Sequence, residues 1–203
     1  MTTCVSGVRT AHTRGVSFAF VSDHLALDFA ATVAWRTTQP KELLAEPEDF
    51  ARWAVEAGVV DRLEAVSHAE LAKARALREA IYRLALAATE GAPAAGGPSD
   101  SADVARVRRA AAHPPVRLTL QAVGRVERRG GVQEVLATLA ASASDLLGGP
   151  DHLLIRHCAG EPCTRLFVDR SQAGTRRWCS KRSCGSRINA AAYRRRTRDD
   201  VQT

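Results

Sequence analysis

Apolar residues recur at helical spacing through most of the first 150 positions, and the clearest case lies between residues 67 and 89. Its apolar positions follow one another every three or four residues: Leu71, Ala74, Leu77, Ile81, Leu84 and Ala88. Ser67 and Glu70 form a capping-box pattern at the start, and Gly91 follows the end. The segment therefore predicts a long helix that packs against the core.

Four shorter helices are predicted on the same grounds. Leu25, Leu27, Phe29 and Val33 suit a short helix near the start. The other three helices are expected at residues 45–58, 101–112 and 131–149. The first of these ends at Gly58, the second before Pro114 and Pro115, and the third at Gly148, Gly149 and Pro150.

Strand patterns are few and short. The stretch "VRLTLQ" (116–121) alternates apolar and polar residues, which predicts a half-buried strand, and "GRVERRGG" (124–131) is its expected hairpin partner. Phe18 and Phe20 suggest one more short strand. The predicted fold is mainly α with a small β element. A loose tail covers residues 1–17, and a mainly helical sensing or dimerisation domain, here called the N-terminal body, covers residues 18–150.

Charge separates this body from the remainder, residues 151–203, here called the C-terminal module. The body and tail carry 17 Lys and Arg against 17 Asp and Glu, whereas the module carries 12 against 5. The whole net charge of +7 therefore lies in the module, which favours a polyanionic partner there. We expect a cytoplasmic protein, because no apolar run is long enough to span a membrane and no secretory signal is visible.

The module also holds four thiols in two closely spaced pairs. Cys158 and Cys163 have C-x4-C spacing, and Cys179 and Cys184 repeat it fifteen residues later. Such pairs suit one tetrahedral structural Zn²⁺ with no position left for a catalytic water. Two disulfides and an iron–sulfur cluster remain alternatives. Cys4, in the tail, is not expected to be a ligand.

The module has too few large apolar residues to fold unaided, which is why a metal is expected. The intervening "RLFVDRSQAGTRRW" (165–178) predicts a hairpin that joins two metal-binding turns, a zinc-ribbon-like layout. After Cys184, "GSRINAAAYRRRTR" predicts a basic C-terminal helix with Arg187, Arg194 and Arg198 along one stripe.

These basic residues predict binding to double-stranded DNA. Arginine suits phosphate oxygens and guanine edges, and asparagine suits adenine in a major groove. The candidate contacts are Arg176, Arg177, Lys181, Arg182, Arg187, Asn189, Arg194, Arg195 and Arg198. The charge count predicts that residues 151–203 alone bind a duplex and that residues 1–150 do not.

The module resembles the CGNR zinc finger of bacterial regulators. The residues that match its signature are Cys158, Cys163, Leu166, Phe167, Asp169, Arg176, Arg177, Trp178, Cys179, Ser180, Cys184, Gly185 and Arg187. The body, through "LALDFAATVAWR" (25–36) and "LLAEPEDFARWAVEAGVVD" (43–61), resembles the ABATE domain that usually precedes this finger. The resemblance implies a stress-linked transcription regulator with a DNA-binding finger. Ala31 and Ser186 stand where the family has Asn; Ser186 is still expected to cap the helix.

Other classes of function remain open beside this one. The zinc ribbon could dock on the transcription machinery instead of DNA. The body could bind a small-molecule effector, form a homodimer, or hold an active site around Asp23, His24 and Asp28, with His68 and His113 in reserve. No paired catalytic constellation is visible, so the chain is not expected to be an enzyme.

Overall fold

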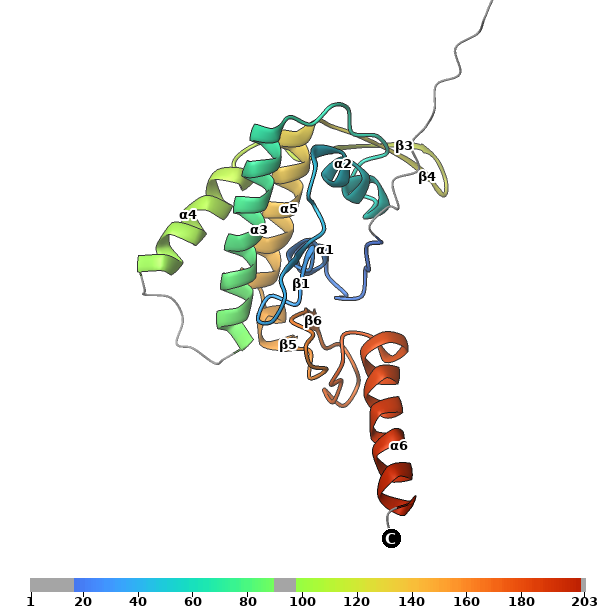
Figure 1. Cartoon of the computed structure of the whole chain (residues 1–203). Helices are drawn as coiled ribbons and strands as arrows, with labels where there is room; N and C mark the ends of the chain where they lie inside the picture. The colour runs from blue at the N-terminus through green and yellow to red at the C-terminus, as the bar shows by residue number, and fades with distance from the viewer. Residues whose placement is uncertain (1–16, 90–97, 202–203) are drawn as a thin grey trace, which may run out of the picture.

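The computed structural model describes residues 17–89 and 98–201, without the side chains of residues 98–100, 192 and 195–201. In Figure 1, long helices stand side by side in the body, and the module lies below them and ends in a protruding helix. The helices of the body are α1 (Leu25–Ala30), α2 (Pro47–Glu56), α3 (His68–Thr89), α4 (Pro98–Ala111) and α5 (Val132–Gly148). The predicted mainly helical fold with small sheets is confirmed.

Aromatic side chains form the centre of the body's core. Phe29 of α1 lies with its ring centroid 5.0 Å from that of Trp53 and 6.2 Å from that of Phe50, both on α2. All three are almost completely buried, and Ile81 of α3 is fully buried with them. Burial of this size is the dominant stabilising contribution in a domain of this length.

The predicted helix ends are largely confirmed. Ser67 donates its backbone N–H to Glu70 Oε2 at 2.8 Å, and Glu70 donates its own to Ser67 Oγ at 3.2 Å, so the capping box at the start of α3 is formed. Gly58 has φ +68 just after α2, a conformation that glycine adopts without strain. Gly91 lies outside the described residues.

The first forty residues differ from the prediction in two places. Phe18 and Phe20 form no strand, because the backbone there pairs with no other segment in the described part of the chain. The first helix ends at Ala30 instead of reaching Val33, which lies in β1 (Val33–Ala34) and pairs with β2 (Lys41–Glu42). Thr32 explains the early end, since its hydroxyl donates to Phe29 O at 2.7 Å in a closing turn.

The predicted hairpin forms, but its predicted half-burial is wrong. β3 (Arg117–Ala122) pairs antiparallel with β4 (Arg125–Arg129), with Leu118 opposite Arg128 and Leu120 opposite Val126. Every residue of β3 is exposed, including Leu118 at 65% and Leu120 at 75%. The alternation of apolar and polar residues therefore marks a face that the rest of the described chain leaves uncovered.

A 3-10 turn, Pro150–Leu154, leads from the body into the module. The module then forms β5 (Ile155–His157), β6 (Leu166–Val168), a π-helical turn η2 (Lys181–Gly185) and α6 (Ser186–Val201). The predicted hairpin between the two thiol pairs is wrong. β6 pairs with β5, which precedes Cys158, and residues 169–180 form no strand.

The body and the module share a small apolar core. Leu27, Ala85 and Leu146 of the body pack with side chains of β5 and β6: Ile155, Leu166 and Val168. Val168 also donates its backbone N–H to Ser22 O at 2.9 Å. A fragment that begins at residue 151 would expose this core. DNA binding by the isolated module, which the charge count predicts, is therefore a poor test of the module's function. None of the described helices is long and apolar enough to span a membrane.

Candidate metal centre and nucleic-acid interface

The four predicted thiols converge at one point of the module. Cys158, Cys163, Cys179 and Cys184 are all buried, and their sulfurs lie within 4.8 Å of one another. The sulfur of Cys179 is 3.8 Å from that of Cys163 and 3.7 Å from that of Cys184. All four are free thiols. Cys4 lies outside the described residues.

This arrangement fits a single tetrahedral ion. Sulfurs bound at about 2.3 Å from such an ion are separated by about 3.8 Å. The measured separations match this value, whereas a cluster with bridging sulfides needs its thiolates further apart. The separations are also far longer than the roughly 2.05 Å of a disulfide. The four side chains therefore suit one metal ion.

The protonation of the thiols supports the need for a cation. Hydrogen bonding with Cys163 and Cys179 lowers the pKa of Cys158. Hydrogen bonding with Cys158 raises the pKa of Cys163 to about 11, and the same kind of contact raises the pKa of Cys179. Crowded thiols share a proton in this way because adjacent thiolates repel each other. A bound cation removes that repulsion, so metal binding would release protons.

The backbone holds each pair of thiols in a tight turn. Cys163 donates its N–H to Gly160 O at 2.8 Å in the first turn, and Gly185 donates its own to Ser180 O at 3.0 Å in the second. The N–H of Cys179 joins the two turns by donating to Cys158 Sγ at 3.3 Å. A Cβ at Gly160 would lie 3.0 Å from the Cβ of Cys184 and 3.2 Å from Ile188 Cδ1. The two turns and the start of α6 therefore meet so closely at this point that a larger side chain would have to push Cys184 or Ile188 aside.

The turn that leads into α6 is capped by a different serine from the one expected. Ser180 Oγ accepts the N–H of Ser183 at 3.3 Å at the start of η2. Ser186, which stands in place of the family's Asn, instead donates its hydroxyl to Lys181 O at 3.1 Å. The prediction that Ser186 caps the helix is therefore wrong, although its hydrogen bond still ties α6 to η2.

A buried carboxylate organises the segment between the thiol pairs. Asp169 Oδ1 accepts the hydroxyl and the N–H of Ser171 at 2.6 and 3.0 Å, and Oδ2 accepts the N–H of Arg176 at 3.0 Å. These bonds, led by that from the Ser171 hydroxyl, lower the pKa of Asp169. The residue types alone did not predict that Asp169 orders this segment. The signal that marks Asp169 in the sequence is its place in the Leu-Phe-x-Asp motif.

Two of the predicted DNA contacts, the half-buried Arg176 and the exposed Arg187, also bond to other groups of the protein. The guanidinium of Arg176 donates to the carbonyls of Val21, Trp178 and Cys179, and pairs with Asp23. It also covers the ring of Phe167, 4.4 Å from its centroid.

Arg187 joins α6 to the first thiol turn. It donates to Gly160 O at 2.9 Å and to Glu161 O at 3.2 Å, and its NH2 lies 3.6 Å from Cys184 Sγ. Arg176, which lies between the thiol pairs and bonds to Val21 and Asp23 of the body, and Arg187, on the basic helix, therefore position the metal centre.

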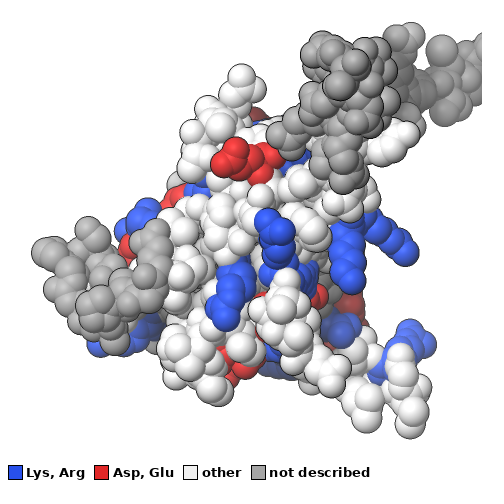
Figure 2. All heavy atoms as spheres, turned by 90° about the horizontal axis from the view of Figure 1, so that it is seen from below, with Lys and Arg blue, Asp and Glu red and all other residues white. Residues whose placement is uncertain are grey.

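The remaining described candidates face solvent. Arg177, Lys181, Arg182, Asn189 and Arg194 are exposed. Arg177 lies over the Trp178 ring at 5.5 Å. Arg195 and Arg198 belong to α6, in the part whose side chains the structure does not describe. Figure 2 views the molecule from the side of the module and shows Lys and Arg side chains spread over this face.

The acidic residues near the start of the body also have structural roles. Asp28 Oδ1 accepts the N–H groups of Val21 and Ser22, both at 3.0 Å, and burial raises its pKa. Asp23 pairs with Arg176. Burial, assisted by Arg170, lowers the pKa of His24, which favours the neutral ring. Of these contacts the Asp23–Arg176 pair joins the body to the module, whereas the bonds of Asp28 stay within the body, and the three residues show no catalytic arrangement.

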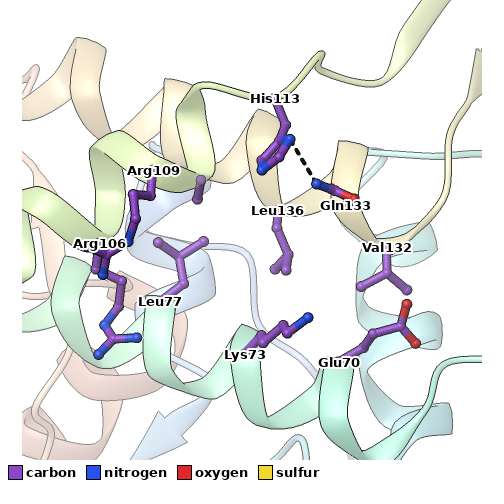
Figure 3. A pocket seen from close by; sticks show the side chains of 10 residues that line it. Glu70, Lys73, Leu77, Arg106, Arg109, His113, Val132, Gln133 and Leu136 are labelled. Atoms are coloured by element: carbon purple, nitrogen blue, oxygen red, sulfur yellow. Dashed lines mark hydrogen bonds between the residues drawn. The ribbon is translucent and has the colours of Figure 1, made fainter.

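A hollow of about 290 Å³ lies between α3, α4 and α5. Figure 3 shows arginines of α4 on one side of it, His113 and Gln133 on another, and Lys73 and Glu70 of α3 along a third. His113 Nδ1 is 2.8 Å from Gln133 Nε2. The apolar lining consists of Leu77, Ala110, Val132 and Leu136. The hollow has a cationic rim over an apolar floor.

Comparison with known families agrees with both halves of this description. Residues 23–150 match the ABATE model, described as "Putative stress-induced transcription regulator", and residues 155–197 match the CGNR zinc finger model. The chain therefore belongs to the ABATE family and carries a CGNR zinc finger at its C-terminal side. Neither model describes an enzyme. No curated protein matches the chain.

Proposed function

We propose that the protein is a DNA-binding transcription regulator whose C-terminal module is held by one structural Zn²⁺ and contacts duplex DNA. The observation that carries the proposal is the exposed cationic surface built directly around four convergent thiols. The body and the tail together add no net charge, so electrostatic attraction to DNA would act on the module. In this division, residues 18–150 sense or dimerise and residues 151–203 bind.

The chain's own residues divide into two roles. Cys158, Cys163, Cys179 and Cys184 would hold the ion, which supplies folding free energy to a module with little apolar core. Arg176 and Arg187 position the metal centre. The proposed DNA contacts are the solvent-facing residues together with the two arginines further along α6: Arg177, Lys181, Arg182, Asn189, Arg194, Arg195 and Arg198.

The test is a salt titration of binding to fluorescent duplexes with the full zinc-loaded chain. If four cations neutralise phosphates, log affinity should fall against log salt with a slope of roughly −4. Replacing Arg177 or Arg194 by Ala should flatten the slope by about one unit each. Arg62→Ala is the matched control, since Arg62 is a fully exposed arginine of the body paired only with a neighbouring glutamate, and it should leave the slope unchanged.

Sequence preference is tested separately with Asn189→Ala. If α6 enters a major groove, this change should relax base preference at a cost of about 1–3 kcal/mol. Binding that survives complete zinc removal would contradict the proposal. So would a stable complex with the transcription machinery accompanied by weak, salt-insensitive DNA binding, which would favour the docking alternative.

The hollow between α3, α4 and α5 supports a second part of the proposal, an effector site in the body. Its cationic rim suits a small organic anion with an apolar portion. Such a ligand should raise the melting temperature, and the rise should keep growing with the logarithm of its concentration above Kd. The shift should disappear in Lys73→Ala and persist in Lys41→Ala, which changes an exposed lysine outside the hollow.

A further inference from the structure

The β3–β4 hairpin projects from the body on the side away from the module, as Figure 1 shows. A two-stranded sheet on its own is only marginally stable in water. This one exposes both Leu118 and Leu120, and every residue of β3 is exposed. Within the described part of the chain, the hairpin therefore has neither a further strand nor a layer packed over its apolar face.

The two outer edges of the hairpin differ in their backbone hydrogen bonds. On the β4 edge, Arg128 O accepts the N–H of Asp61 at 3.1 Å, and Arg128 donates its N–H to Asp61 Oδ2 at 2.8 Å. Because the backbone of Arg128 faces outward, the Leu118–Arg128 pair is one that exchanges no hydrogen bonds. The N–H and C=O of Leu118 then point outward from β3.

The same reasoning extends along β3 in steps of two residues. Leu120, opposite Val126, also directs its N–H and C=O outward. Val116, one step in the other direction, is already satisfied, since its N–H donates to Thr138 Oγ1 at 2.9 Å. Within the described chain nothing bonds to the outward groups of Leu118 and Leu120. The open edge is short and has a defined register.

Charge decides which partner this edge accepts. In a self-pairing of β3 centred on Thr119, Leu118 lies opposite the partner's Leu120, Arg117 opposite the partner's Gln121, and Thr119 opposite its own copy. No like charges meet, and the leucines of both copies gather on one face, since Leu118 and Leu120 are two residues apart.

The corresponding pairing of β4 is unfavourable. It would place Arg125 opposite the partner's Arg129 and Glu127 opposite its own copy, and like charges directly opposite each other destabilise a sheet. The β4 edge is also partly occupied by Asp61. Self-pairing therefore has one compatible edge.

We propose that the open β3 edge is a dimerisation surface on which a second copy of this chain pairs antiparallel, making a continuous four-stranded sheet. The inference deepens the proposed dimerisation of the body and does not depend on DNA binding. Two copies would exchange four backbone hydrogen bonds through Leu118 and Leu120 and bring four leucines into contact on one face of the sheet. A symmetric pairing of this kind closes after two copies and does not propagate.

The test is sedimentation velocity of the full zinc-loaded chain without DNA, over a range of micromolar concentrations. The wild-type chain should form a concentration-dependent dimer. Leu118→Lys combined with Leu120→Lys should weaken it roughly tenfold or more. Leu153→Lys is the matched control, because Leu153 is exposed to the same degree, 66%, in the module, and it should leave the dimer unchanged.

Thr119→Lys provides a second variant that keeps the hairpin intact. Within one chain Thr119 lies opposite Glu127, so the new lysine gains an attractive neighbour there, whereas in the dimer it meets its own copy. The dimer should weaken, and added salt should restore part of it by screening the repulsion. A wild-type chain that stays monomeric overturns the inference, as does a dimer that the leucine and threonine variants leave intact.

Because no DNA is present, a monomeric result would refute this surface and leave the proposed DNA binding standing. Conversely, a dimer that the β3 variants disrupt would support the surface even if the module bound no DNA.

Discussion

The body and the module are built from different stabilising interactions. The body buries a continuous set of large apolar side chains, with Trp53, Phe29 and Phe50 at its centre. The buried cluster of the module consists of four thiols and Phe167, with Trp178 and Val21 packed against it. Removal of apolar surface from water is enough to fold the body. In the module, polar sulfurs occupy the place of an apolar core.

Because of this difference, we expect different changes to unfold the two parts, although they share an apolar joint at Leu27, Leu146 and Ile155. The body should respond to changes in packing volume, whereas the module should respond to its metal. Paired changes, one on each side of the joint, test this contrast.

The largest effect is expected from metal removal. Structural zinc supplies an apparent binding free energy of about 10–16 kcal/mol, so chelation or Cys179→Ser should unfold the module. Hydrogen exchange should show lost protection at residues 155–185, while α3 and α5 stay protected. Elemental analysis should find one zinc per chain before removal. Iron with visible absorbance, or protection unchanged without metal, would refute this account.

The second largest effect is expected from one core substitution in each part. Phe29→Ala should lower the free energy of unfolding of the body by about 3–5 kcal/mol, because the site is fully buried among rings that cannot close the cavity. Phe167→Ala, at an equally buried position, should chiefly weaken zinc retention. Urea unfolding and competition with a zinc chelator measure the two quantities. Equal effects of both changes on both quantities would contradict the contrast.

The sequence predicted the elements that rest on periodicity or fixed spacing. The long helix α3, its capping box and the hairpin β3–β4 follow from local patterns, and the convergence of the thiols follows from their spacing. The pairing of β6 was not predictable in this way. Its partner β5 lies before the first thiol, and the pairing depends on the joint with the body.

Arginine roles were the least predictable, because a charge pattern does not say which cations find internal partners. Arg78 of α3 is 3% exposed and donates to Glu42 at 2.6 Å, so a residue that reads as surface is part of the interior. Arg176, which the charge pattern marked only as a DNA contact, donates to three carbonyls of its own chain. Its neighbour Arg177 is exposed.

These two neighbouring arginines give the third prediction. Arg176→Ala should lower the stability of the module by about 1–3 kcal/mol, since it leaves three partly buried carbonyls without this donor. Arg177→Ala should change stability by less than about 0.5 kcal/mol and reduce DNA affinity instead. Thermal unfolding and fluorescence anisotropy on the same preparations separate the two outcomes. If Arg177→Ala were the more destabilising of the two, the assignment of their roles would be reversed.

The smallest effect concerns Asp28, at the joint between the two parts. Burial raises its pKa above that of the unfolded chain, so the ionised form is less favourable in the folded protein. Its contribution to stability is therefore greatest at acid pH and declines as the pH rises through the folded pKa.

Asp28→Asn removes the ionisation but keeps an Oδ1 that can accept the N–H groups of Val21 and Ser22. The difference in unfolding free energy between the two proteins should thus shift in favour of the variant from about pH 4 to neutral. Urea titrations across this pH range measure the difference in unfolding free energy. Loss of zinc at acid pH affects both proteins alike, so it cancels from this difference. Asp28→Ala, which loses both hydrogen bonds, should be less stable throughout, and a difference that shifted in favour of the wild type with rising pH would show that the carboxylate is preferred at this site.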